Sequence, residues 1–301
     1  MADCSIGPGD LGHRWLGLDS TGVPNWRRFA LVANRHRLLS AAFMRSSPML
    51  SERAAQEKAQ FDKGLRRSGY DDVLSHTDHF YRQLRMQINA EELAYGHGKT
   101  VLEIGSTAWA SLADYDIFPN ELHCINISEV ELEKGKKLAP RNRNHPNFHL
   151  MDAHNLQFSD AYFYVVFGGS VLHHLEFTRA LDEIRRVLKP CGKILFYEPL
   201  GINPISKAVR ILTPQARTSD ERPLGFVELR QLRERFLCKF YYQQLFSVPF
   251  GVLSRMLFSD PSNVMMKTIF HLDRSLDKLA PPLRPLFRNV TVVGTPLDRT
   301  G

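Results

Sequence analysis

The chain has 301 residues, enough for one sizeable hydrophobic core with an appended element. Its 43% hydrophobic and 24% charged residues are typical of a soluble globular protein, and no stretch has the apolar length of a membrane span. The formal net charge of +7 favours acidic partners such as phosphorylated small molecules, anionic lipid surfaces or nucleic acid, without choosing among them.

Cysteine and histidine positions argue against a disulfide framework and against a metal site. The cysteines are scattered, with no CxxC spacing, which favours reduced thiols and a cytoplasmic location. The twelve histidines include no HExxH motif and no pairing with cysteine at ligand spacing. We therefore expect no metal ligands in this chain. The four cysteines are Cys4, Cys124, Cys191 and Cys238.

Residues 1–50 form a basic arm, which we expect to be flexible. Between Ser20 and Ser51 there is no acidic residue, whereas five arginines occur. The arm is interpreted as a solvated segment, as translated sequence upstream of a start at Met44 or Met49, or as a segment that contacts anionic membrane or acts as a leader. These interpretations stay open from composition alone.

Residues 51–98 are predicted to form leading helices that cap the following domain. Apolar residues recur at helical spacing over residues 50–74 and again over 75–96. Ser51 and Ser75 are the expected N-caps of the two helices. The sequence GHGK then ends the helical pattern.

From Thr100 onward, apolar strands alternate with helices, which predicts βαβ units and a parallel sheet covered on both faces. Ser128 is the expected N-cap of the second helix, because acidic residues follow it in the first turn. The predicted strands are 100–104, 122–127, 147–153, 161–169 and 192–200, and the predicted helices are 109–117, 128–142 and 178–189.

After Leu200 the alternation changes. We expect a helix over 225–236, a strand over 238–248, an apolar helical insertion at about 249–286, and a last strand over 289–295. The insertion is interpreted as a helical pair packed on the core, as a lid over an apolar acceptor, or as a surface that leans on membrane beside Arg255 and Lys267.

Four segments at consistent spacing carry a resemblance to a known family. They are VLEIG (101–105), INIS (125–128), the stretch from 151 to 175, and the stretch from 180 to 199. Residues 99–301 thereby resemble the class I S-adenosylmethionine-dependent methyltransferases, in particular the small-molecule, methyltransferase type 11-like branch. The resemblance implies a doubly wound, Rossmann-like, seven-stranded and mostly parallel α/β sheet, with N-terminal helices and a helical insertion between the last two strands.

The resemblance also implies S-adenosyl-L-methionine as the cofactor, held at the carboxyl ends of the strands. Asp152 would accept a hydrogen bond from the adenine amino group, and Ile127 would pack on the ring. The position of Asn126 holds, in the family, an acid that grips the ribose hydroxyls. Gly105 would let the backbone approach the methionine portion, and Glu103 would order the loop or receive the amino group. The full set of expected contacts is Glu103, Gly105, Ser106, Asn126, Ile127, Asp152, Ala153 and Gly168.

Three residues depart from the family pattern. Thr107 and Trp109 stand where the family has small loop residues, and Asn126 replaces a carboxylate by a neutral amide. The separation of 17 residues between Trp109 and Asn126 equals the family's spacing, so the loop is substituted without being shortened. We expect the Trp109 ring to pack in the core. If it fills the pocket instead, the protein is a non-catalytic pseudo-methyltransferase that acts as a binding module.

His173 is the expected catalytic residue, since an imidazole that titrates near neutrality suits a general base. The alternative is that His173 and His174 only shape the loop before the next helix. The predicted function is methyl transfer to a small-molecule acceptor, such as a sugar, a lipid-linked intermediate, or a polyketide- or quinone-type hydroxyl or carbon. Nucleic acid is not expected as a partner, because GGSVLHHL lacks an Asn/Asp-Pro-Pro-Tyr/Phe motif after the fourth strand.

Overall fold

The structure is a computed structural model that describes residues 55, 58, 70–106, 112, 115–138, 145–204, 207 and 222–298. The statements below refer to these residues. The basic arm, the N-cap at Ser51, and the loop residues Thr107 and Trp109 lie outside them.

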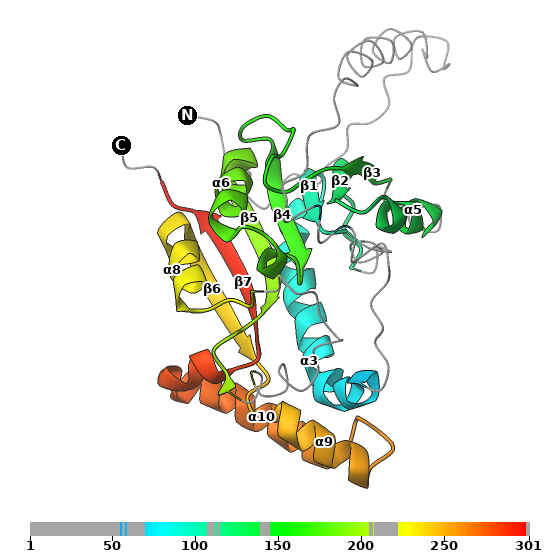
Figure 1. Cartoon of the computed structure of the whole chain (residues 1–301), viewed down its shortest axis with the longest axis vertical. Coiled ribbons are helices and arrows are strands. Elements are labelled where there is room, and N and C mark those ends of the chain that lie inside the picture. Colours follow the sequence, from blue (N-terminus) through cyan, green and yellow to red (C-terminus); the bar gives the residue numbers. More distant parts are fainter. Residues whose placement is uncertain are drawn as a thin grey trace, which may run out of the picture. The chain divides into compact units, whose positions relative to one another are not determined.

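The core of the fold is one seven-stranded sheet (Figure 1). Its strand order is β3-β2-β1-β4-β5-β7-β6, and all pairs are parallel except those that β7 makes with β5 and β6. The predicted seven-stranded, mostly parallel sheet is thus confirmed. The strands are β1 (Thr100–Ile104), β2 (Glu121–Asn126), β3 (Asn147–Leu150), β4 (Phe163–Gly169), β5 (Leu188–Pro199), β6 (Phe236–Gln243) and β7 (Asn289–Pro296).

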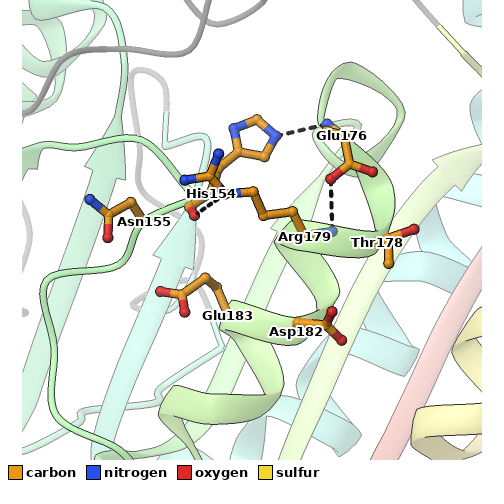
Figure 2. Close-up of a pocket in the computed structure, with 7 residues that line it drawn as sticks. All are labelled: His154, Asn155, Glu176, Thr178, Arg179, Asp182 and Glu183. Atoms are coloured by element: carbon orange, nitrogen blue, oxygen red, sulfur yellow. Dashed lines mark hydrogen bonds between the residues drawn. The ribbon is translucent and has the colours of Figure 1, made fainter.

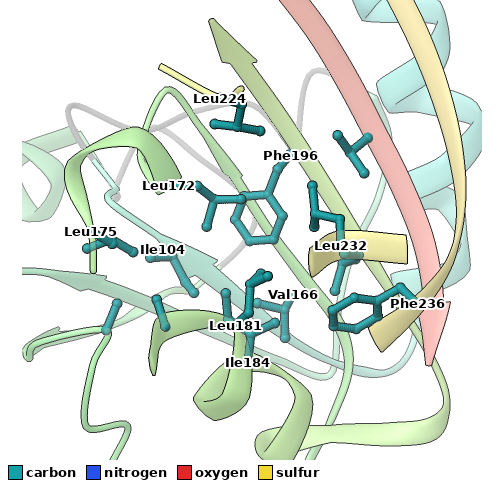
Figure 3. Packing of buried hydrophobic residues seen from close by; sticks show 14 of the residues in the cluster. Ile104, Val166, Leu172, Leu175, Leu181, Ile184, Phe196, Leu224, Leu232 and Phe236 are labelled. Atoms are coloured by element: carbon teal, nitrogen blue, oxygen red, sulfur yellow. The ribbon is translucent and has the colours of Figure 1, made fainter. Parts of the chain in front are cut away.

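One face of the sheet packs against α6 (Phe177–Val187) and α8 (Phe226–Arg235). In α6 the buried residues recur at helical spacing, and the polar face of the helix stays exposed. Figure 3 shows Leu181 and Ile184 of α6 beside Val166 and Phe196 of the sheet. This burial of apolar area is the main stabilising contribution on this face.

The other face packs against α3 (Tyr70–Leu93). Ile88 and Leu93 join a buried cluster with strand residues, and Lys193 on β5 pairs with Glu92 at 2.8 Å. The predicted N-cap at Ser75 is wrong, because α3 continues through this position without interruption. Neither proline nor glycine occurs in α3, so the polar residue alone does not end the helix.

Further boundaries differ from the prediction, and β3, for example, ends at Leu150 and not at residue 153. β5 begins at Leu188, directly after α6, and its pairing with β4 shifts register before Lys193. β6 ends at Gln243, because Gln244 adopts a φ of 68° and turns the chain away from the strand direction. The predicted N-cap at Ser128 is confirmed, since its hydroxyl accepts a hydrogen bond from the Glu131 amide at 3.3 Å.

The helical insertion between the last two strands is present. It consists of α9 (Ser247–Leu257), α10 (Val264–Leu279) and a short 3-10 helix (Pro281–Leu286). In Figure 1, α9 and α10 lie beyond the end of the sheet at which β4 and β5 finish. The strand order reverses between β1 and β4, and ligands of doubly wound sheets bind at such a point, outside the carboxyl ends of the strands.

Candidate functional site

The turn after β1 needs a glycine. Gly105 has a φ of 74°, and a Cβ at this position would lie 2.7 Å from Val171 Cγ2. The amides of Gly105 and Ser106 both donate to the carbonyl of Ile125, at 3.0 and 3.1 Å. The chain at this turn is thereby held against the end of β2.

Glu103 is a partly buried carboxyl group just before this turn. Ser106 Oγ donates to Glu103 Oε2 at 3.1 Å, and Cys124 Sγ lies 3.6 Å from the same oxygen. Burial raises the pKa of Glu103 to about 8, despite these two donors. The group is therefore mostly protonated at pH 7, and a cation placed beside it would lower its pKa again.

Asn126 at the end of β2 braces the loop. Its Nδ2 donates to the Ser106 carbonyl at 2.7 Å, and its Oδ1 accepts from the Ser128 amide at 2.8 Å. A carboxylate at this position would accept from Ser128 but would have no hydrogen to donate to Ser106. The amide is thus explained by its contacts within the protein.

Asp152, two residues beyond β3, is buried and held by His154. Its Oδ1 accepts from the His154 backbone amide at 2.9 Å and lies 2.5 Å from His154 Nδ1. His154 Nε2 accepts from the Glu176 amide at 2.7 Å, so Nδ1 carries the proton and donates to Asp152. His154 therefore connects Asp152, the residue predicted to bind adenine, to the N-terminus of α6.

A pocket of about 480 Å³ borders this connection (Figure 2). Arg179 Nε donates to the His154 carbonyl at 3.0 Å, and the Glu176 side chain accepts from the Arg179 amide at 3.0 Å. Arg179 thus holds the His154 backbone, and Glu176 is the N-cap of α6. The pocket does not include any of the predicted cofactor contacts. It is lined by His154, Asn155, Glu176, Thr178, Arg179, Asp182 and Glu183.

The remaining predicted contacts lie at the same strand ends. Gly168 on β4 fits closely against β1, because a Cβ there would lie 2.8 Å from the Ile104 carbonyl oxygen. Ala153 is buried next to Asp152, and Ile127 follows β2 directly and is partly exposed. The structure therefore brings all eight predicted residues to the carboxyl ends of four neighbouring strands.

His173, the predicted catalytic residue, is buried and paired with a carboxylate that the sequence analysis missed. Glu198 near the end of β5 is fully buried, and its Oε2 lies 2.7 Å from His173 Nδ1. Its Oε1 accepts from the amides of Val171 and Leu172 at 2.9 and 2.8 Å. An acidic residue within the apolar run ILFYEP was the signal for this pair.

On the face of the sheet that α3 covers, a partly buried polar cluster holds α3 against the end of the sheet. Arg85 forms an ion pair with Asp78, and its guanidinium lies 4.6 Å from the centre of the Tyr197 ring. Gln244 Nε2 also donates to Asp78, at 2.8 Å. These contacts account for the placement of α3 beside β5.

Neither a metal centre nor a membrane span is found within the described ranges. No group of three or more His, Cys, Asp or Glu side chains in this part of the chain could hold a metal ion. Of the helices that the structure describes, none is long and apolar enough to cross a bilayer.

Comparison with known proteins agrees with this geometry. Residues 102–196 match the family model described as "Methyltransferase domain". The solved structure of geranyl diphosphate C-methyltransferase from Streptomyces coelicolor A3(2) superposes with a TM-score of 0.54 and 14% identity, over 73% of this chain and 80% of that chain. The fold is therefore that of a class I methyltransferase. Residues 102–196, about a third of the chain, are thus similar to the methyltransferase domain of that family model.

Two curated relatives match over short stretches. Phthiotriol/phenolphthiotriol dimycocerosates methyltransferase 1 of Mycobacterium ulcerans is 34% identical over 114 residues, which cover 36% of this chain and 41% of that protein. Glycine/sarcosine/dimethylglycine N-methyltransferase of Actinopolyspora halophila is 32% identical over 90 residues, which cover 28% of this chain and 15% of that protein. The chain thus spans less than half the length of these two relatives.

Proposed function

We propose that this protein transfers a methyl group from S-adenosylmethionine to a small-molecule acceptor. The observation that carries the proposal is the buried Asp152 carboxylate, held by His154 just after β3, at the same edge of the sheet as the glycine turn of Gly105 after β1. A fixed carboxylate is suited to an adenine amino group, and backbone at a glycine turn can approach a ligand closely.

The residues present fit this cofactor. Burial raises the pKa of Glu103, and its carboxyl group would give up its proton when the ammonium group of the methionine portion lies beside it. Asp152 would hold the adenine and Ile127 would pack on its ring. Ser106, Ala153 and Gly168 would line the cofactor with backbone and small side chains.

When bound, S-adenosylmethionine supplies a methyl group activated by its positive sulfur. The protein's contribution is to align the acceptor with that methyl group and to move a proton where the acceptor is a hydroxyl. His173 donates through Nδ1 to Glu198, so Nε2 is the nitrogen that accepts the acceptor's proton. Glu198 stabilises the resulting imidazolium, as a positioning carboxylate does for a general base.

The acceptor is proposed to be apolar, with a hydroxyl group or a carbon atom as the methylated position. The names of two similar proteins support this class, since one concerns geranyl diphosphate and the other phthiotriol dimycocerosates.

The contacts of Asn126 favour the non-catalytic alternative, since both ends of its amide bind the protein and no carboxylate meets the ribose. Trp109→Gly distinguishes the two functions. If the ring packs in the core, the variant loses stability and cofactor affinity does not rise. Tighter binding of S-adenosylhomocysteine by the variant would show that Trp109 fills the pocket.

The direct test is calorimetry with S-adenosylhomocysteine. Asp152→Ala should weaken binding about 10- to 100-fold, which corresponds to a hydrogen bond of about 1–3 kcal/mol to a charged group. Asp160→Ala is the matched control, because Asp160 is exposed and pairs at the surface with Arg186. Undetectable binding by the unmodified protein, or an unchanged affinity of Asp152→Ala, would overturn the assignment.

A further inference from the structure

Helix α9 turns its large apolar side chains outward. Val252, Leu253, Met256 and Leu257 share one helical face, and all four are exposed. Met256 and Leu257 are 78% and 62% exposed. In a helix that only covers a core, these residues would point inward.

The inward face of α9 carries small and polar residues instead. A Cβ at Gly251 would lie 2.2 Å from Thr77 Oγ1, so α9 and α3 approach closely there. Ser254 Oγ lies 2.8 Å from His76 Nδ1, and Ser247 Oγ donates to Asp273 at 2.7 Å. Close approach and hydrogen bonds therefore fix α9 in place, and its stability does not require the outward apolar residues.

Helix α10, which contacts α9, also carries exposed apolar side chains. Leu272 and Leu279 are exposed on one edge of this helix, Leu279 by 83%. Lys267 and Lys278 are exposed on the adjacent edge, whereas Asp273 and Asp277 of the same helix are buried. The outer face of α10 is thus apolar and cationic, with its acids turned inward.

We propose that the α9–α10 hairpin docks on an anionic lipid surface. Exposed apolar side chains beside exposed cations are the combination that binds at the boundary of headgroups and acyl chains. Arg255 on α9 adds a third exposed cation, and Asp260 in the connecting loop is the exposed acid of the hairpin. A second copy of this surface would bring like charges together, which disfavours self-association through it.

The placement of the hairpin gives the docking a consequence. Figure 1 shows α9 and α10 beyond the end of the sheet at which β4 and β5 finish, the end that carries Gly168 and Glu198. Docking would therefore present this end of the sheet to the lipid surface. The docking does not depend on methyl transfer, so each proposal can fail without the other.

The test is sedimentation of the full chain with phosphatidylcholine vesicles that contain or lack phosphatidylglycerol. We expect binding to the anionic vesicles that weakens as salt increases. Met256→Gln with Leu257→Gln should lower the partition coefficient at least tenfold, since two side chains no longer enter the apolar layer. The control is Phe226→Gln with Val227→Gln, which removes two comparably exposed apolar residues from α8.

A second pair of substitutions tests the electrostatic part. Lys267→Glu with Lys278→Glu should reduce binding to anionic vesicles by about tenfold or more and flatten the salt dependence. All of these positions are exposed, and melting temperatures will verify that each variant is folded. Equal binding by the α9 variant and its α8 control would overturn the proposal. The proposal would also be overturned if sedimentation equilibrium showed that the unmodified protein is a dimer and the α9 variant is a monomer.

Discussion

The connection from Asp152 through His154 to α6 can be separated into its two hydrogen bonds. In His154→Asn, the side-chain amide reaches the position of Nδ1 and keeps a donor to Asp152. The longer side chain of His154→Gln reaches the position of Nε2 and keeps an acceptor for the Glu176 amide. The two substitutions therefore remove opposite halves of the connection, which the structure gives as 2.5 Å and 2.7 Å contacts.

The expected magnitudes follow from these contacts. His154 is almost fully buried, so removing the acceptor of the Glu176 amide leaves a buried donor unsatisfied, at a cost of about 1–3 kcal/mol in stability. Removing the Nδ1 donor costs Asp152 a charge-assisted bond of about 1.5–3 kcal/mol. Only the second loss frees the Asp152 carboxylate, which we propose as the adenine contact. His154→Gln should therefore bind S-adenosylhomocysteine about tenfold more weakly, and His154→Asn should bind it within about threefold of the unmodified protein.

Calorimetric titration measures the affinities, and urea unfolding of the same preparations measures the stabilities. Both variants should be destabilised, so stability alone does not distinguish them. The split in affinity is the result that a purely structural role of His154 would not produce. Equal affinities of the Asn and Gln variants would refute the argument that His154 positions Asp152.

Three further predictions concern protons and packing. The pKa of Glu103 is raised to about 8, so if the cofactor's ammonium group lies beside it, cofactor binding at pH 7 should release on the order of one proton. Calorimetry in buffers of different ionisation enthalpy measures this release. No release would leave Glu103 only a loop-ordering role. The pKa of His149 is lowered from 6.5 to about 4 by burial and by His123. Between these pH values the unfolded chain binds a proton that the native state does not bind. The free energy of unfolding should therefore fall by about 1–2 kcal/mol, discounted for partial exposure, as pH drops from 6.5 to 4. His149→Gln should lack this decrease. Gly168→Ala should cost about 1–3 kcal/mol, because its Cβ meets a backbone oxygen, whereas Gly169→Ala has open space and should be nearly neutral in thermal unfolding.

The sheet and the cofactor edge were predictable because both depend on local patterns. Apolar runs at strand spacing and the turn at Gly105 are visible in the sequence, and neighbouring parallel strands bring their carboxyl ends together. The N-cap predicted at Ser75 failed because a local capping preference does not end a helix whose residues on both sides remain helical.

The acceptor side was less predictable because its contacts join distant positions. Glu198 meets His173 across 25 residues, and their meeting depends on the register of β5 beside β4. Helical spacing identified the apolar stripe of α9 but not the direction in which it points. That direction is decided by Gly251 and Ser254, which let α9 approach α3 through its small face.

Glu198 and Asp152, two buried acids of the site, accept hydrogen bonds from different kinds of donor. Glu198 is surrounded by amides of the turn that begins at Val171, so its charge holds that turn in place before any ligand arrives. Asp152 Oδ1 accepts from both the backbone amide and the Nδ1 of His154, which fixes the direction of the carboxylate. Glu198 therefore anchors the His173 turn, whereas ligand contact remains the proposed role of Asp152.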